Sequence, residues 1–230
     1  MVVSSARPYF CPYPGYFATA LASDVFVILD TVQFPRGSTW ITRNRFKNDQ
    51  GALWLSIPVW KKGLGLQKIA DVRICPEGRW QRKHLDGIRQ AYRHAPYLDE
   101  HLGFLEDLLS SGQETILEMN LKAITYVMDF LRAHARVTLL SDLGTDEQGS
   151  ALLVDVCLRL SADRYLAPAP ARSYLEEELF RGAGIELNYL RPMTPVYPQL
   201  WGEFMPNLSI FDLLLNCGPK AREMVGTVGR

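Results

Sequence analysis

The stretch DVFVILD, residues 24–30, places five consecutive apolar side chains between two aspartates. A continuous apolar run of this length is typical of a strand that is buried on both faces, as the strands of parallel sheets are. Parallel strands also need crossover connections, which are usually helices. We therefore expect residues 24–30 to form a parallel strand in a sheet that helices cover.

The segments around this strand continue the same pattern. Before it, a loop rich in proline and aromatic residues (8–17) and a short helix near 16–22 predict a strand–loop–helix–strand opening. Past residue 136, strand-length apolar runs alternate with helix-length segments. The predicted strands are 137–140, 164–167 and 185–190, and the predicted helices are 150–160 and 174–181. Such alternation predicts a parallel-rich, Rossmann-like α/β sheet.

The middle of the chain reads differently. Residues 53–59 and 67–74 alternate well enough for two further strands, and apolar side chains at helical spacing predict a helical layer or insertion over about 80–135. A last helix is expected from Ser209, with a stop at Gly218. Without repeats or linkers, we expect residues 1–230 to form a single α/β domain.

Composition narrows the class of protein. The chain is 47% hydrophobic and 22% charged, which is ordinary for a globular protein and argues against disorder. We see no secretory signal and no apolar run of about 18 residues, so we expect a cytoplasmic protein without membrane insertion. The four cysteines lack Cys-x-x-Cys spacing, and no zinc, Walker A, Gly-x-Gly-x-x-Gly or Gly-x-Ser-x-Gly motif occurs. No metal is predicted, and the cofactor stays unknown.

Charge is unevenly distributed although the net charge is zero. Residues 36–94 hold 13 basic and 4 acidic residues, a net charge of +9, whereas residues 95–230 hold 11 and 19, a net charge of −8. The basic block favours a small anionic partner such as a nucleotide sugar. It lacks the long basic stripes of a nucleic-acid surface. Alternatively, the basic and acidic parts face each other or water.

Asp30 and Gln33 follow the end of the predicted central strand. In open α/β sheets, ligands bind beyond the carboxyl ends of the strands, where a carboxylate can take a proton or hold a hydroxyl. Asp30 is therefore a candidate catalytic residue and Gln33 a candidate substrate-binding residue. The alternative role for Asp30 is to cap the turn that follows.

The triplet Arg43-Asn44-Arg45 offers many hydrogen-bond donors within three residues. Guanidinium groups suit phosphate or carboxylate, and on a strand Arg43 and Arg45 would share one face. We predict that all three bind substrate. An exposed edge strand that uses charge to prevent aggregation is the alternative.

A predicted helix carries Trp80, His84 and Tyr92, and the first two are four residues apart and share a face. An aromatic ring beside an imidazole can stack on a base or sugar while the imidazole moves a proton. His84 is therefore a second catalytic candidate, with Trp80 and Tyr92 as binding residues. Alternatively, Trp80 packs in the core with His84 at its edge.

Two proline-stiffened aromatic segments lie near opposite ends of the chain, and stiff loops suit the walls of a small-ligand pocket. We predict that Tyr16, Asp30, Gln33, Tyr197 and Gln199 line one cleft, with Arg43 or Arg45 at its rim. The alternative is that the tyrosines only cap the core.

Several stretches, in order along nearly the whole chain, resemble the WbqC-like protein family. They are Pro8, PYPGYF (12–17), DVFVILDTVQF (24–34), RNR (43–45), residues 54–59, 80–84 and 91–97, PVYPQ (195–199) and residues 208–218. The resemblance implies a bacterial cytoplasmic protein of O-antigen or other surface-polysaccharide biosynthesis. It further suggests an acyl or aminoacyl transferase, for example a glycyl transferase, acting on a nucleotide-linked amino sugar. The alternatives are a nucleotidyl- or adenylate-forming enzyme and a non-catalytic ligand-binding protein of the same fold.

The chain departs from the family pattern at two places. Ala6-Arg7 stand where the family usually has His-Gln, and Pro168 and Ala171 stand where the family tends to have glycines. If that histidine is a base in the family, this chain uses another group or has changed its reaction. Glycines allow close approach of backbone to a ligand, so the ligand itself can differ here.

Overall fold

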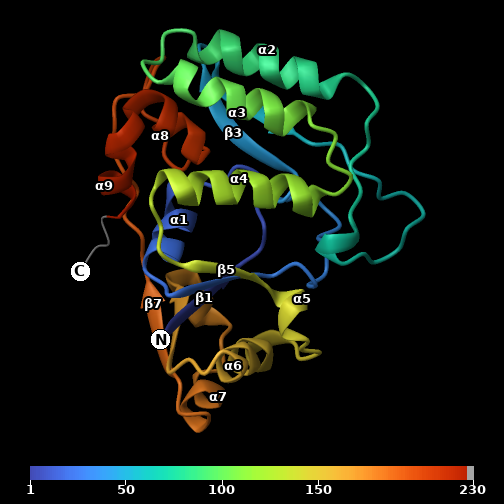
Figure 1. Cartoon of the computed structure of the whole chain (residues 1–230), viewed down its shortest axis with the longest axis vertical. Helices are drawn as coiled ribbons and strands as arrows, with labels where there is room; N and C mark the ends of the chain where they lie inside the picture. Colours follow the sequence, from blue (N-terminus) through green and yellow to red (C-terminus); the bar gives the residue numbers. More distant parts are fainter. Residues whose placement is uncertain (227–230) are drawn as a thin grey trace.

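The computed structural model describes residues 1–226. Its centre is a five-stranded sheet with the order β5-β2-β1-β6-β7, and every neighbouring pair is parallel (Figure 1). The strands are β1 (Val2–Ala6), β2 (Val25–Ile28), β5 (Arg136–Leu139), β6 (Arg164–Pro168) and β7 (Glu186–Leu190). The predicted parallel-rich α/β sheet flanked by helices is confirmed.

Strand β2 shows why the stretch DVFVILD forms the middle of the sheet. All four of its residues are buried, and alternate side chains enter different clusters of the core. Val25 and Val27 pack with α6 (Gly149–Arg159) and α7 (Glu177–Gly182), while Phe26 and Ile28 pack with α1 (Pro14–Leu21) and α4 (Ile116–Phe130). A strand covered on both faces needs apolar residues at consecutive positions. Figure 1 shows α6 and α7 on one side of the sheet and α1 and α4 on the other.

A long insertion separates β2 from β5. It holds the antiparallel hairpin of β3 (Arg43–Asn48) and β4 (Gly51–Ser56), and then α2 (Trp80–Tyr92), α3 (Leu98–Ser110) and α4. The three helices match the predicted helical layer, and the side chains of Thr115 and Glu118 cap the start of α4 reciprocally. Helices α2 and α3 lie beyond α4, farther from the parallel sheet (Figure 1).

The strand predicted at 67–74 is wrong. Residues Ile69–Asp71 form a short 3-10 turn, with only isolated bridges on either side of it. The backbone N–H groups of Ile69 and Ala70 donate to the carbonyls of Val32 and Asp30, so this segment packs against the loop after β2. Its hydrogen bonds to an irregular loop take the place of a strand ladder.

The last third follows the predicted alternation with small shifts. Helix α5 (Leu140–Leu143) is a single turn, and the helix expected from 174 begins only at Glu177 because residues Ala169–Ser173 form a 3-10 turn. The chain then reaches α8 (Ile210–Cys217), which the Ser209 hydroxyl caps, and α9 (Ala221–Val225). Both C-terminal helices lie beside α1 and α3 in Figure 1.

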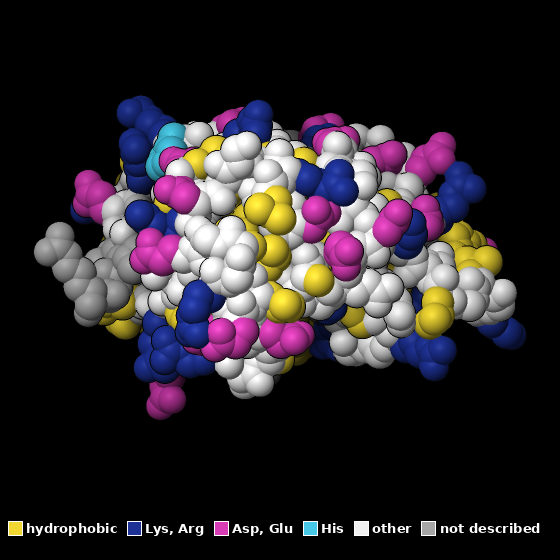
Figure 2. Space-filling view, turned by 90° about the horizontal axis from the view of Figure 1, so that it is seen from below, with side chains coloured by type: hydrophobic (Ala, Val, Ile, Leu, Met, Phe, Trp, Pro, Cys, Tyr) yellow, Lys and Arg dark blue, Asp and Glu magenta, His cyan; other side chains and the backbone are white. Residues whose placement is uncertain are grey.

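Ion pairs join the basic block to the acidic part of the chain. Arg73 pairs with Glu114 at 2.6 Å and Arg89 with Glu106 at 2.5 Å. On the face drawn in Figure 2, basic and acidic side chains are interspersed around a small apolar group. The uneven charge along the sequence is thus partly balanced by contacts in space. Within residues 1–226, no helix combines the length and the apolar character needed to cross a membrane.

Candidate functional site

The order of the strands creates a switch point between β1 and β6. The chain moves from β1 outward through β2 to β5, then returns to the other side of β1 to form β6 and β7. The connections on the two sides of such a point diverge and leave a crevice at the carboxyl ends of the strands. A pocket of about 510 Å³ lies there, which we call the switch-point pocket. Residues that line it include Ser5, Arg7, Tyr9, Tyr13, Tyr16, Gly149, Ser150, Tyr165, Pro168, Ala171 and Glu176.

Helix α6 directs its N-terminus at this pocket, because Gly149 and Ser150 are among the lining residues. No side chain caps the start of the helix, and the Ser150 hydroxyl instead accepts a hydrogen bond from the backbone N–H of Glu176 at 3.0 Å. The first amides of a helix point outward and carry partial positive charge. The start of α6 therefore offers donors to an anion in the pocket.

Arg7 stands directly after β1, at the mouth of the switch-point pocket. Its side chain is exposed and forms no hydrogen bond or ion pair with any residue in 1–226. Among the described lining residues, Arg7 and Glu176 are the only charged ones. The unpaired guanidinium and the uncapped helix start both line the pocket and favour an anion within it.

Tyrosines form much of the remaining wall. Tyr16 is 4% exposed, its ring contacts Phe26 edge-on at 5.2 Å between centroids, and its hydroxyl has no hydrogen-bond partner. Burial, with smaller effects from Tyr9 and Tyr13, raises the pKa of Tyr16 well above its usual value. The Tyr16 hydroxyl is therefore neutral and donates to no acceptor within residues 1–226. Across the pocket, the hydroxyls of Ser5 and Tyr165 hydrogen-bond at 2.7 Å.

Tyr13 joins the switch-point pocket to two neighbouring ones. It lines a pocket of about 360 Å³ with Arg191 beyond β7, and a pocket of about 300 Å³ with Trp40 and Arg45. Its ring lies close over the start of α1, where a Cβ at Gly15 would come within 2.6 Å of Tyr13 Cε2. Gly15 thus lets the Tyr13 ring take its place where the three pockets meet.

Asn44 and Arg45 lie in this region, beside a pocket other than the one predicted. Arg45 donates to the carbonyls of Pro206 and Asn207, at 3.3 and 3.2 Å, and lines the pocket of about 300 Å³. Asn44 lines the same pocket, but its amide nitrogen is engaged with the carbonyls of Phe10 and Cys11. Arg43 shares the solvent-facing side of β3 with Arg45 and stacks on Trp54, 3.7 Å from the ring centroid.

Asp30 and Gln33 do not line the switch-point pocket or the two pockets that adjoin it. Asp30 is buried, and its Oδ1 accepts a hydrogen bond from the backbone N–H of Ser141 at 3.0 Å. It thereby holds the start of α5, in keeping with a capping role. Gln33 is exposed and forms an isolated bridge with Lys68. The cleft predicted from Tyr16, Asp30 and Gln199 is not formed.

Tyr92, Tyr197 and Gln199 turn inward instead. The hydroxyls of Tyr92 and Tyr197 donate to the two carboxylate oxygens of buried Asp212, at 2.6 and 2.8 Å. Gln199 accepts from Lys47 Nζ at 3.1 Å and from the Met205 N–H at 2.9 Å. These contacts form a buried polar cluster that ties the C-terminal segment to the insertion. Both tyrosine hydroxyls are thus bonded inside the protein, to a carboxylate.

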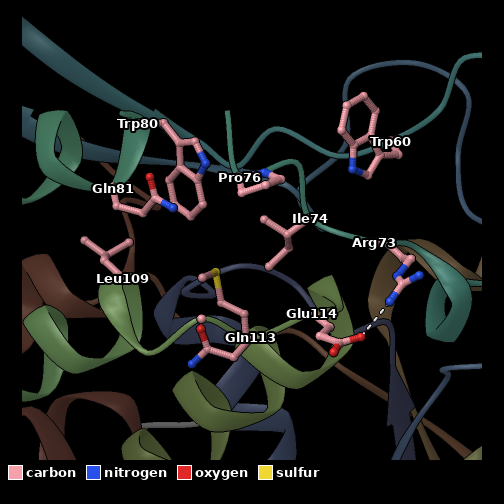
Figure 3. Close-up of a pocket in the computed structure, with 11 residues that line it drawn as sticks. Trp60, Arg73, Ile74, Pro76, Trp80, Gln81, Leu109, Gln113 and Glu114 are labelled. Carbon is pink, nitrogen blue, oxygen red and sulfur yellow. Dashed lines mark hydrogen bonds and ion pairs between the residues drawn. The ribbon is translucent and has the colours of Figure 1, made fainter. Parts of the chain in front are cut away.

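His84 and Trp80 lie near a different depression. His84 Nε2 is 2.8 Å from the Ser56 carbonyl oxygen. Burial lowers the pKa of the imidazole, and the hydrogen bond with the Ser56 backbone partly opposes this shift. Trp80 is buried, donates from Nε1 to the Cys75 carbonyl at 3.0 Å, and lines a pocket of about 390 Å³ with Trp60 on its other side (Figure 3). Trp80 and His84 thus share a face of α2, but neither of them lines the switch-point pocket.

Comparison with known proteins places the chain in a family. The profile of the WbqC-like protein family matches residues 7–224. The chain belongs to the WbqC-like protein family. It is also 30% identical over 222 residues to the uncharacterized protein Rv1507c of Mycobacterium tuberculosis (strain ATCC 25618 / H37Rv), covering 95% of each chain. No solved structure is significantly similar to it.

The two places at which the resemblance suggested a departure from the family pattern both concern residues of the switch-point pocket. Ala6 ends β1 and Arg7 follows it directly, whereas Pro168 ends β6 and Ala171 lies in the 3-10 turn after it; all four line the pocket. The residues that the resemblance singled out therefore lie around one pocket. Sequence reasoning did not propose four further lining residues as site residues, because no local motif connects them: Tyr9, Tyr13, Tyr165 and Glu176.

Across residues 1–226 of this WbqC-like protein, no three His, Cys, Asp or Glu side chains come together as a metal site requires. The switch-point pocket itself combines an unpaired cation, outward-pointing amides, hydroxyl donors and one acidic residue. This set can bind an anion and supply a proton acceptor beside it.

Proposed function

We propose that this WbqC-like protein transfers an acyl or aminoacyl group to a nucleotide-linked amino sugar in surface-polysaccharide or related glycan biosynthesis. The observation that carries the proposal is that Arg7, the uncapped start of α6 and Tyr16, whose buried hydroxyl is unpartnered within residues 1–226, all line the switch-point pocket. Each of these groups is a hydrogen-bond donor that has no acceptor among residues 1–226, which is the arrangement that a phosphate group completes.

The reaction needs a proton acceptor close to the sugar amine. In the transfer, the amine nitrogen forms a bond to the acyl carbon of an activated ester or thioester, the bond from that carbon to its leaving group breaks, and the amine loses a proton. Glu176 is the one acidic residue among the described lining residues of the switch-point pocket, so we assign it this proton. Asp30 is engaged with Ser141, and His84 with Ser56.

A thermal-shift screen tests the proposal. Wild-type protein is heated with nucleotide-linked amino sugars, acyl-CoAs, amino acids and nucleoside triphosphates. At about 100 times its dissociation constant, a ligand stabilises the folded state by about 2.7 kcal/mol, which shifts the melting temperature measurably. Stabilisation by nucleotide sugars, followed by mass-spectrometric detection of an acylated sugar, is the expected result. Stabilisation by nucleoside triphosphates with pyrophosphate exchange would instead identify a nucleotidyl- or adenylate-forming enzyme.

Replacing Arg7 with alanine is expected to weaken nucleotide-sugar binding roughly 10- to 100-fold, because a charge-assisted hydrogen bond to phosphate is lost. Isothermal titration calorimetry measures the change. Arg93 is the matched control, since it is an exposed arginine that contacts only its neighbour His94. Arg93→Ala should bind like the wild type. Equal affinities of the Arg7→Ala and wild-type proteins would remove the anion site from this pocket.

Tyr16→Phe separates binding from folding. The hydroxyl is buried without a partner, so its removal should leave the free energy of unfolding unchanged within about 0.5 kcal/mol, or raise it. Nucleotide-sugar affinity should fall by about 2- to 10-fold, because the ligand loses one neutral hydrogen bond. Urea denaturation and calorimetry measure the two quantities. A destabilised variant with unchanged affinity would assign the hydroxyl to the fold.

A further inference from the structure

The hairpin of β3 and β4 presents two tryptophans to solvent. Trp40, just before β3, is 43% exposed, and Trp54 on β4 is 42% exposed. Their rings stack at 5.7 Å between centroids with an interplanar angle of 26°. Indoles are large apolar groups that proteins usually bury, so a stacked and exposed pair is a surface prepared for contact with another flat molecule.

Two arginines of β3 lie against this aromatic pair. Arg43 Cζ is 3.7 Å from the Trp54 centroid, and Arg45 Cζ is 5.8 Å from the Trp40 centroid and 5.9 Å from that of Trp54. The Nε atoms of both arginines are buried and lack hydrogen-bond partners. Arg45 is held in place by the carbonyls of Pro206 and Asn207. The platform therefore combines flat apolar faces with cations at fixed positions.

This platform borders the pocket of about 300 Å³ introduced above. Trp40, Arg45, Tyr9 and Tyr13 all line it. The same two tyrosines also line the switch-point pocket. A single ligand that passes Tyr13 can thus place an anionic part near Arg7 and a ring near Trp40.

We infer that the pocket beside Trp40 is the subsite for the nucleobase of the nucleotide-linked substrate. This inference rests on the proposed function and names the part of the ligand that the switch-point pocket does not hold. A base is planar and stacks on indole, phenol and guanidinium groups, all of which border this pocket. The side chain of Asn207, which lines the pocket and accepts only a long hydrogen bond of 3.4 Å from Thr194, offers an amide to the edge of the base.

Paired ligands with and without a base test the inference. Calorimetric titrations use UDP-, dTDP- and GDP-linked amino sugars and, for comparison, glucosamine 1-phosphate. Trp40→Ala should weaken binding of the preferred nucleotide sugar about 5- to 150-fold, the effect of losing one stacking contact. Its affinity for glucosamine 1-phosphate should stay within about twofold of the wild type, because no base is present to stack. Trp40→Phe, which keeps an aromatic face, should recover most of the nucleotide-sugar affinity.

The control is Trp60→Ala, since Trp60 is 44% exposed but lines the separate pocket of Figure 3. It should bind both ligands normally. If Trp40→Ala binds the nucleotide sugar normally while Arg7→Ala does not, the base lies elsewhere and only this inference is overturned. If the wild type binds no nucleotide sugar, the proposed function fails and the base subsite fails with it.

Discussion

Replacing Asp212 with alanine is expected to lower the free energy of unfolding by about 3–5 kcal/mol. The carboxylate is 1% exposed and accepts hydrogen bonds from Tyr92 at 2.6 Å and Tyr197 at 2.8 Å. Hydrogen bonds to a charged group contribute about 1.5–3 kcal/mol each, and an orphaned buried hydroxyl adds a desolvation cost. Alanine removes both bonds and leaves both hydroxyls without this acceptor.

Urea denaturation followed by circular dichroism measures the loss. Asp129→Ala is the matched control, because Asp129 is an exposed aspartate on α4 with no side-chain hydrogen bond or ion pair to the described residues. It should change the free energy of unfolding by less than about 0.5 kcal/mol. If Asp212→Ala lost as little stability as the control, the buried cluster would contribute little to the free energy of unfolding.

This cluster shows where prediction from the sequence ends. The fold was predictable because the apolar run at 24–30 and the alternation after residue 136 are local patterns. Asp212 lies 120 residues from Tyr92, and no local pattern announces that contact. Tyr92 and Tyr197 were therefore predicted to face a substrate, and they face a carboxylate of the same chain. A polar side chain can be predicted as functional only when its internal partners are known.

The candidate site shows the opposite case. Arg7 was noticed only as a departure from a family pattern, because one arginine after a five-residue strand has no periodicity to interpret. Its importance comes from the strand order, which places the carboxyl end of β1 beside that of β6, although Pro168 at the end of β6 lies 161 positions after Arg7 (168 − 7). The candidate pocket does lie at the carboxyl ends of parallel strands, as the rule for open α/β sheets expects. Applied to β2, it pointed to Asp30, whereas the pocket opens beside β1.

Acid is expected to destabilise the protein through His101. This imidazole is 1% exposed on α3, its Nδ1 is 2.7 Å from the Tyr126 hydroxyl oxygen, and its Nε2 is buried without a partner. Burial lowers the pKa of His101 from 6.5 to about 4. As the pH falls from 6.5 to 4, His101 therefore binds a proton in the unfolded chain but stays neutral in the folded chain. Stability is full above pH 6.5 and decreases toward pH 4, by about 3 kcal/mol in total.

Urea denaturation at intervals between pH 7 and pH 4.5 measures this slope, and the difference between wild type and variant isolates the histidine from the carboxylates that begin to titrate at the acid end. His101→Gln, which keeps a polar group near Tyr126, should lose most of the slope. His94 is exposed and serves as the control, so His94→Gln should keep the slope.

The packing around His101 explains the size of the effect: its ring lies 4.8 Å from that of Phe130 and 5.9 Å from that of Tyr126, between centroids. Protonation would place a charge among these rings, and His101 forms no ion pair within residues 1–226. Equal slopes in the wild type and His101→Gln would therefore show that the imidazole charges without unfolding.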